Sequence, residues 1–139
     1  MSLEIAPSPD FAPVRALREV VFVTEQGFDP AGEFDAIDDA AVHLLARLDG
    51  APVGCARLYE VAGEGRIGRI CVLSEGRGRG IGAALVEAGL AHFRARGLAT
   101  VALSAQVRAA AFYEGLGFTA YGGIIDDEGV PHRMMRRAP

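Results

Sequence analysis

Apolar positions in the first part of the chain change from a helical period to an irregular pattern. Residues 3–6 can form a short strand, and Asp10 is a residue type that caps helix N-termini. Apolar side chains then recur every three or four positions from Val14 onward, which predicts a helix over about residues 11–24. The stretch 26–39 holds glycines, a proline and several acids, which indicates a loop with about one helical turn.

Three apolar stretches in the middle of the chain predict an antiparallel meander. Asp49-Gly50 is a strong two-residue hairpin signal, and Gly63-Glu64-Gly65 is expected to form the second turn. The strands that these turns separate are predicted at 42–48, 52–61 and 66–73.

The second half predicts two further helices and three strands. Apolar residues line one side of a helix over 81–96, which Gly97 would end as a C-cap. The remaining predicted elements are a buried strand at 100–104, an amphipathic helix at 107–116, and a closing hairpin of 118–121 with 132–136 around a turn at 126–131.

This order of elements defines the expected fold class. It is an α/β architecture of the α+β kind, with a central, mostly antiparallel twisted sheet flanked by helices. One parallel strand joins the sheet after a right-handed crossover. A length of 139 residues is typical of one domain, so we expect residues 1–139 to form a single domain.

Composition and charge exclude several classes of protein. Half of the residues are hydrophobic and 23% are charged, which favours a packed globule. The apolar runs are too short to span a membrane, and the prolines at 7 and 9 interrupt any secretory signal, so a cytoplasmic protein is expected. A net charge of −4 disfavours nucleic-acid binding. Cys55 and Cys71 lie in apolar stretches and are expected to be reduced and buried, and no metal site is predicted.

The most distinctive local feature is a glycine-arginine turn between a predicted strand and the helix at 81–96. Its sequence is Arg77-Gly78-Arg79-Gly80-Ile81-Gly82. Glycines let the backbone approach a ligand closely, and the first amides of a helix are unpaired and carry a partial positive charge. Arginines add forked hydrogen-bond donors. The turn therefore predicts a pyrophosphate site.

Other interpretations of this turn compete. The spacing of Gly78, Gly80 and Gly82 does not fit a dinucleotide-binding fingerprint, and the Gly-Lys-Ser/Thr of a Walker A loop is missing. An arginine-glycine RNA-binding segment is normally longer and lies in a basic chain. A flexible turn with solvated arginines stays open as the structural alternative.

The chain resembles the GCN5-related N-acetyltransferase (GNAT) superfamily over nearly its whole length. The acyl-CoA signature Gln/Arg-x-x-Gly-x-Gly/Ala is matched by Arg77, Gly80 and Gly82. A later block is similar to the family's Asn-x-x-Ala-x-x-Phe-Tyr-x-x-x-Gly-Phe, with Gln106 in place of Asn: Gln106-x-x-Ala109-x-x-Phe112-Tyr113-Glu114-x-Leu116-Gly117-Phe118. More narrowly, three segments resemble the ElaA/YjcF-type branch: Arg18-x-x-Val21-Phe22-Val23-x-Glu25-Gln26-Gly27, Ala105-Gln106, and Glu128-Gly129-Val130-Pro131-His132.

The resemblance implies the acyl-CoA N-acyltransferase fold, with acetyl-CoA as co-substrate and no metal. In this family the strand before the phosphate turn splays from its neighbour and binds the pantetheine arm through its backbone. The implied cofactor-binding residues are Ile70, Cys71, Val72, Arg77, Gly78, Arg79, Gly80, Ile81, Gly82 and Gln106. The amide of Cys71 or Val72 would polarise the thioester carbonyl, and Arg77 or Arg79 could reach a phosphate. Direct transfer is favoured over an acyl-cysteine because it needs only two aligned reactants.

The resemblance also implies catalytic residues. Tyr113 matches the tyrosine that protonates the departing CoA thiolate in many members, with a packed core aromatic as the alternative. Phe112 is expected to fill the core. A base is needed because a lysine-like amine has a pKa of about 10.4. The candidates are Glu25, Asp38, Asp39, His43 and His132.

Other charged residues are expected to be structural. Arg18 should pair with an acid, Asp35 should cap a helix, and Asp38 and Asp39 are more typical of solvated loop acids.

We therefore expect an N-acetyltransferase that moves an acetyl group from acetyl-CoA to a primary amine of a small molecule or peptide. The alternative is a CoA-binding or regulatory module of the same fold without turnover. A comparable Arg and Val-Phe-x-x-Glu arrangement also occurs in acyl-homoserine-lactone synthases, but those chains are longer. No nucleic acid or membrane partner is expected, and a homodimer is left open.

Overall fold

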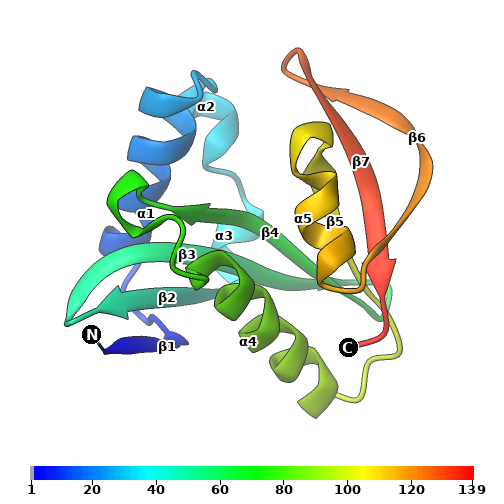
Figure 1. The fold of residues 1–139 in the computed structure, drawn as a ribbon, viewed down its shortest axis with the longest axis horizontal. Helices are drawn as coiled ribbons and strands as arrows, with labels where there is room; N and C mark the ends of the chain where they lie inside the picture. The colour runs from blue at the N-terminus through cyan, green and yellow to red at the C-terminus, as the bar shows by residue number, and fades with distance from the viewer. Residues whose placement is uncertain (1) are drawn as a thin grey trace.

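The computed structural model describes residues 2–139, which form one seven-stranded sheet with helices on both faces (Figure 1). The strand order is β1-β2-β3-β4-β5-β7-β6. The strands are β1 (Leu3–Pro7), β2 (Val42–Leu48), β3 (Ala51–Val61), β4 (Glu64–Val72), β5 (Val101–Gln106), β6 (Thr119–Asp127) and β7 (Val130–Arg137). The helices are α1 (Ala12–Arg18), η1 (Glu19–Glu25), α2 (Pro30–Glu33), α3 (Ile37–Ala40), η2 (Ser74–Gly76), α4 (Ile81–Ala95), η3 (Val107–Ala109) and α5 (Ala110–Gly115). The predicted α/β class with a mostly antiparallel sheet is confirmed.

The meander β2-β3-β4 forms as its turn sequences indicate. Asp49 and Gly50 both have positive φ, at 51° and 87°, as a tight hairpin turn of the I′ kind requires. The second turn consists of Ala62 and Gly63, also with positive φ, so the expected turn at 63–65 is wrong by one residue. Gly65 instead lies in β4, where a Cβ would come within 2.7 Å of the Phe93 ring of α4. Close packing of α4 on the sheet explains why glycine is needed there.

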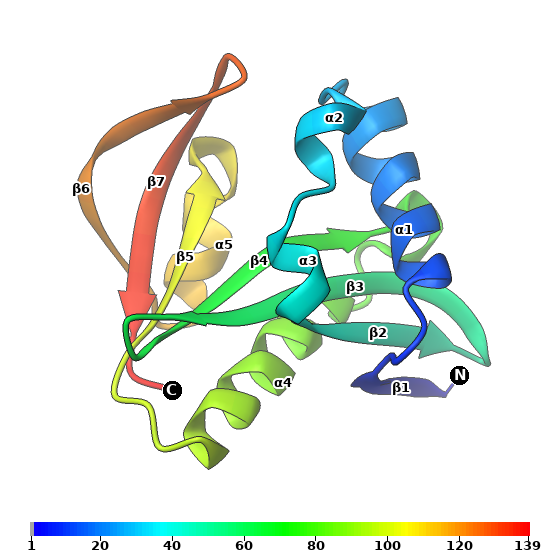
Figure 2. The same cartoon turned by 180° about the vertical axis from the view of Figure 1, so that it is seen from behind.

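Two hydrophobic clusters lie on opposite faces of the sheet. In Figure 2, α1 and α3 lie in front of the sheet, and α4 and α5 lie behind it. The larger cluster joins α4 to β2–β5, with Leu85, Leu90 and Phe93 fully buried. The smaller cluster joins α1 and η1 to the other face through Val14, Leu17, Val21, Leu45, Cys55 and Cys71.

The sheet opens between β4 and β5. These parallel strands pair only at Gly65 with Val101 and Arg66 with Ala102, and β4 then runs on to Val72 without β5. Figure 1 shows β5, β7 and β6 leaving the plane of the other four strands. A bulge assists the divergence, because Gly68 pairs with Arg57 and Cys71 with Cys55, which leaves two residues opposite Ala56. One of them is Arg69, with a φ of 48°.

Several helices differ from the sequence prediction. The helix expected over 11–24 is an α-helix only to Arg18 and continues as the π-helix η1, in which an i→i+5 bond joins the Gln26 amide to the Val21 carbonyl. Two short helices, α2 and α3, form where a loop with one helical turn was expected over 26–39, and α3 ends one residue beyond that stretch. The helix expected at 107–116 begins as the 3-10 turn η3. Period counting at 3.6 residues per turn cannot register such local changes in helix pitch.

The closing hairpin is longer than predicted. β6 and β7 meet at a turn formed by Glu128 and Gly129, both with positive φ, rather than across 126–131. A register shift between Tyr121 and Ile125 bends β6. Within residues 2–139, none of the helices combines the length and apolarity that a membrane crossing needs.

Candidate active site

The glycine-arginine turn presents open backbone at the start of α4. Gly78 and Gly80 have φ values of 77° and 76°, a conformation that side-chain-bearing residues rarely adopt. A Cβ at either position would meet no atom within 4 Å, so the space above the turn is open to a ligand. Gly80 is the N-cap of α4, and Ile81 anchors the turn because its side chain is buried in the larger core. The turn therefore has the shape expected of an anion cradle.

A cleft of about 770 Å³, here called the outer cleft, runs from this turn along the unpaired part of β4. Six of the expected cofactor-binding residues line it: Ile70, Cys71, Val72, Arg77, Gly82 and Gln106. Gly78, Arg79, Gly80 and Ile81 are not part of its wall. Phe112 does line the cleft, with its ring 3.6 Å from the position of a Cβ on Gly82. Its side chain is 45% exposed, so the expectation that Phe112 fills the core is wrong.

Arg77 and Glu25 form an ion pair across one side of the outer cleft. Both terminal nitrogens of Arg77 donate to the Glu25 carboxylate at 2.6 Å, and Nε donates to the Val72 carbonyl at 3.0 Å. The hydrogen bond from Arg77 is the main reason that the pKa of Glu25 is lowered. A carboxylate held in this way binds a proton poorly, which argues against Glu25 as the general base. Arg77 likewise points at Glu25 rather than out over the turn.

A second cavity of about 300 Å³, here called the central cavity, lies inside the opening between β4 and β5. Its walls come from the segment that follows η1, the bulge of β4, the end of β5, α5 and the β6–β7 turn. Tyr113 and His132 both line it. The two cavities share a wall made of Gln26, Phe28, Ile70, Gln106, Arg108 and Ala109. A molecule in the outer cleft and one in the central cavity would meet at this shared wall.

Tyr113 lies in an aromatic setting on α5. Its ring makes edge-on contacts with Phe112 and Phe118, with centroids 5.0 and 6.1 Å away. Burial raises the pKa of Tyr113 to about 12. The phenol is therefore protonated at every physiological pH. It can donate a hydrogen bond into the cavity while its ring also contributes to packing.

His132 is 7% exposed and lies on β7, in register with Gln106 on β5. Its Nδ1 is 2.9 Å from the Val130 carbonyl oxygen. Because a carbonyl only accepts, Nδ1 carries the proton of this hydrogen bond, which leaves Nε2 as the ring nitrogen open to another group. Among the base candidates, His132 combines a place in the central cavity with an available acceptor nitrogen.

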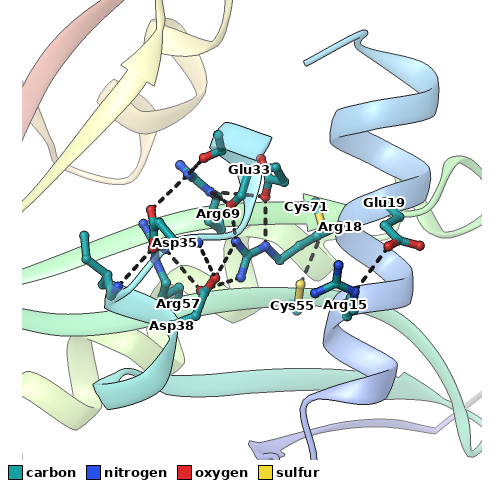
Figure 3. Close-up of polar contacts among 12 residues, drawn as sticks. Arg15, Arg18, Glu19, Glu33, Asp35, Asp38, Cys55, Arg57, Arg69 and Cys71 are labelled. Carbon is teal, nitrogen blue, oxygen red and sulfur yellow. Dashed lines mark hydrogen bonds and ion pairs between the residues drawn. The ribbon is translucent and has the colours of Figure 1, made fainter. Parts of the chain in front are cut away.

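Asp38 belongs to a buried charge network next to the segment of α2 and α3 (Figure 3), and His43 lies beside that network. Arg18 is fully buried and pairs with Glu33 at 2.8 Å and Asp38 at 2.7 Å, which confirms its expected structural role. Arg57 pairs with Asp38 at 3.1 Å. Burial alone would raise the pKa of Asp38, but the hydrogen bond and charge of Arg18, with a backbone hydrogen bond, lower it to about 2.

Asp38 is therefore not the solvated loop acid that its sequence context suggests, because its side chain is only 9% exposed. Asp35 lies one residue before Ala36, the N-cap of α3, and its carboxylate accepts a hydrogen bond from the Ile37 amide at 3.1 Å. His43 binds the Asp38 carbonyl at 3.0 Å through Nε2 and packs on Phe11, and Asp39 is exposed. His43 and Asp38 face the network rather than either cavity wall.

Several residues of the site were not singled out from the sequence. Arg69 clamps the α2 segment by donating to the Glu33 carbonyl at 3.2 Å and the Gly32 carbonyl at 3.3 Å. Gln26 and Arg108 belong to the shared wall. Gln26 lies in one of the segments that resemble the ElaA/YjcF-type branch. Its position in the site becomes visible only through its hydrogen bond with Gln106, eighty positions away in the sequence.

Comparison with known proteins agrees with this geometry. The chain matches the acetyltransferase (GNAT) family over residues 11–118. It is 31% identical over 122 residues to the uncharacterized N-acetyltransferase YjcF of Bacillus subtilis, with 87% of each chain covered. Among solved structures it is similar to an acyl-CoA N-acyltransferase from Pseudomonas aeruginosa, at 32% identity and a TM-score of 0.85 over 99% of both chains. ElaA of Escherichia coli gives 26% identity and a TM-score of 0.81 over 98% of both chains.

The fold and these likenesses define the class as an acyl-CoA-dependent acyltransferase. The chain belongs to the acetyltransferase (GNAT) family. Its likeness to YjcF and ElaA confirms the narrower resemblance to that branch.

Proposed function

We propose that this protein transfers an acetyl group from acetyl-CoA directly to a primary amine of a small molecule or peptide, within a single domain over residues 1–139. The observation that carries the proposal is the junction of two cavities. The outer cleft runs from the glycine turn along the free part of β4, and the central cavity reaches the same wall from the other side. An acyl donor and an amine can each enter by its own opening.

The residues present fit coenzyme A. The open amides around Gly78 and Gly80 suit a pyrophosphate, and the backbone of β4 from Ile70 to Val72 is available to an extended pantetheine arm. The amide of Cys71 or Val72 polarises the thioester carbonyl in this scheme. Acetyl-CoA supplies the activated acyl group.

The side chain of Cys71 has no role in the proposed transfer. It is only 4% exposed, belongs to the smaller core cluster, and its Sγ lies 3.4 Å from Sγ of Cys55. Although Cys71 lines the outer cleft, its thiol packs against Cys55 in the core, and attack by this thiol on the acyl group would require it to leave that packing. Direct transfer therefore fits the structure better than an acyl-cysteine.

The proposed reaction balances without any further reactant. The neutral amine attacks the thioester carbon, the C–N bond forms and the C–S bond breaks, and the proton lost by nitrogen ends on the CoA sulfur. Nε2 of His132 accepts the amine's proton, Tyr113 gives its phenolic proton to the departing sulfur, and the proton on His132 then returns to the Tyr113 oxygen through solvent. Because the pKa of Tyr113 is about 12, its phenol holds its proton until the thiolate forms.

The deciding experiment is an amine-library assay with acetyl-CoA, read by release of free CoA thiol and by product mass. The chain contains no lysine, so an acetylated lysine product cannot come from the enzyme itself. We expect at least one amine to be acetylated, with turnover reduced in Tyr113→Phe and unchanged in Arg96→Ala. Arg96 pairs with Glu60 at the far end of α4 and is a remote control. Acetyl-CoA binding by calorimetry without any acetylated product would favour the CoA-binding module and overturn the proposal.

We also propose a cytoplasmic location. The two thiols lie 3.4 Å apart and are free, a state that a reducing compartment maintains. The state of these thiols in protein isolated under non-reducing conditions with a blocking reagent tests this. A disulfide in freshly isolated protein would contradict it.

A further inference from the structure

Three side chains form a hydrogen-bonded relay along the wall shared by the two cavities. Nε of Arg108 donates to Oε1 of Gln106 at 2.6 Å, and Nε2 of Gln106 donates to Oε1 of Gln26 at 2.9 Å. The second bond joins the end of β5 to the residue that follows η1, so it crosses the opening of the sheet. All three residues line both cavities.

The direction of this relay is fixed by its arginine. A guanidinium only donates, so the oxygen of Gln106 must face Arg108 and its amide nitrogen must face Gln26. That nitrogen also only donates, so Gln26 must turn its own oxygen toward Gln106. The amide nitrogen of Gln26 is then the free end of the relay. Among residues 2–139 the structure gives it no acceptor, and it carries two N–H donors at the shared wall.

Charge around the central cavity is distributed unevenly. The shared wall carries the Arg108 guanidinium, whose terminal nitrogens are not used in the relay. The far side carries Asp127 and Glu128 on the exposed β6–β7 turn. Glu128 also reaches α2, where its carboxylate accepts the Asp29 amide at 3.3 Å. An amine approaching from the acidic side meets N–H donors and a cation where the two cavities join.

Such a wall suits an acceptor that has an oxygen beside its amine. A carbonyl or carboxylate oxygen on the neighbouring carbon would receive the Gln26 donors, whereas a bare ammonium would find no partner there and would be repelled by Arg108. We propose that Gln26 recognises the carbonyl oxygen of an α-amino acid or of an amino-terminal residue, and that Gln106 and Arg108 are positioning residues that fix its orientation. This inference rests on the proposed amine acetylation and narrows its substrate class.

Matched pairs of amines test the inference. Leucine and leucinamide are compared with isoamylamine, and arginine and argininamide are compared with agmatine. In each set the last compound lacks the carboxylate or amide on the carbon that bears the amine. Steady-state kcat and KM are measured with acetyl-CoA for each probe. In parallel, binding of each probe to the CoA-saturated protein is measured by calorimetry. We expect affinity, and kcat/KM corrected for the fraction of each amine that is neutral, to be up to about tenfold higher for the carbonyl-bearing members, as one well-formed hydrogen bond allows.

Two variants separate recognition from packing. Gln26→Leu removes the donors at similar volume, and the preference should disappear because kcat/KM falls by about tenfold more for the carbonyl-bearing probes than for the bare amines. Gln106→Glu keeps the shape of the side chain, but the new carboxylate can only accept hydrogen bonds. The Gln26 amide must therefore flip, donate to this carboxylate and present its oxygen to the cavity. The preference should then reverse in favour of the bare amines. If the relay had a structural role alone, both variants would lower kcat/KM and affinity equally for the carbonyl-bearing and the bare amines.

The outcomes distinguish the inference from the proposed function. Acetylation of bare and carbonyl-bearing amines with equal corrected kcat/KM would overturn the inference and leave the function standing. Preferential binding of the carbonyl-bearing probes without any product would overturn the function and leave the recognition standing. Equal binding with no product would overturn both. Thermal unfolding and acetyl-CoA affinity of each variant, with Arg96→Ala as control, verify that the fold and the outer cleft are intact.

Discussion

Replacing Asp38 by Asn should destabilise the protein strongly at neutral pH and by less in acid. The Asp38 carboxylate accepts from Nη1 and Nη2 of Arg18 at 2.7 and 3.2 Å, from Arg57 at 3.1 Å and from the Asp35 amide at 3.1 Å. An asparagine keeps the shape but turns an NH₂ group toward donors. It also leaves the buried Arg18 with one anionic partner fewer.

The loss of unfolding free energy in Asp38→Asn has two parts. Breaking one arm of a buried ion pair costs about 3–5 kcal/mol at pH 7. Part of this cost depends on pH, because the pKa of Asp38 is about 2 in the folded protein against 3.8 ordinarily. A carboxyl whose pKa is lowered by folding stabilises fully above its unfolded value and loses that contribution as pH falls through its folded value. The difference corresponds to about 2 kcal/mol, lost mainly between pH 4 and pH 2.

The ionisation of Glu33 has the opposite effect on the free energy of unfolding. Burial raises its pKa, so its ionisation opposes folding as pH rises. Its contribution is present in both proteins and largely cancels when the Asp38→Asn variant is subtracted from the parent. The subtraction therefore isolates Asp38.

The assay is urea unfolding followed by circular dichroism at several values from pH 7 to pH 2.5. We expect the free-energy difference between parent and Asp38→Asn to be constant above about pH 4 and to shrink steadily below it. The control is Asp39→Asn, because Asp39 is exposed. The free energy of unfolding of this variant should stay within about 0.5 kcal/mol of the parent. A difference below 1 kcal/mol at pH 7, or one that grows in acid, would refute the assignment of Asp38 to a buried ion-pair network.

Three further predictions concern the site. Tyr113→Phe should lower kcat by about 10²-fold with little change in acetyl-CoA affinity, and unchanged turnover in steady-state assays would assign Tyr113 to packing alone. Gly80→Val should weaken acetyl-CoA binding measured by calorimetry, whereas Gly50→Val, which strains a remote turn with the same positive φ, should not; equal affinities would move the pyrophosphate elsewhere. The thiols of Cys55 and Cys71 should resist alkylation in the native protein and react in urea, because the Sγ contact with Cys71 and burial raise the pKa of Cys55 well above its usual value. Fast labelling without urea, read by intact mass, would contradict the burial of this pair.

Much of the fold could be predicted because it depends on local signals. Turn residues such as Asp49-Gly50 and the glycines at 78 and 80 require particular backbone conformations, and the structure shows them. The apolar stripe of α4 and the alternation in the meander follow directly from burial on one face. The opening between β4 and β5 was implied by the resemblance, and the pairing of only two residue pairs confirms it.

What could not be predicted depends on contacts between distant segments. Asp38 looks like a loop acid until Arg18 and Arg57 are seen to surround it. Phe112 has the large apolar side chain typical of a core residue. However, α5 is only six residues long, and it places the Phe112 ring at the outer cleft. The relay from Arg108 to Gln26 joins residues that no periodic pattern connects. Hydrogen-bond direction in that relay follows from donor chemistry only once the three side chains are placed together.

Under the proposed function, the short pairing between β4 and β5 makes the stability of this protein depend on the concentration of its acyl donor. Beyond Arg66, one side of β4 has main-chain groups that β5 does not pair, and such an edge is a template for misassembly when nothing covers it. A nucleotide thioester that occupies the edge protects it, and at a hundred times its dissociation constant a ligand adds about 2.7 kcal/mol to the free energy of unfolding. Cells starved of acetyl-CoA should therefore hold less of this protein, because the unliganded chain is cleared by proteases sooner.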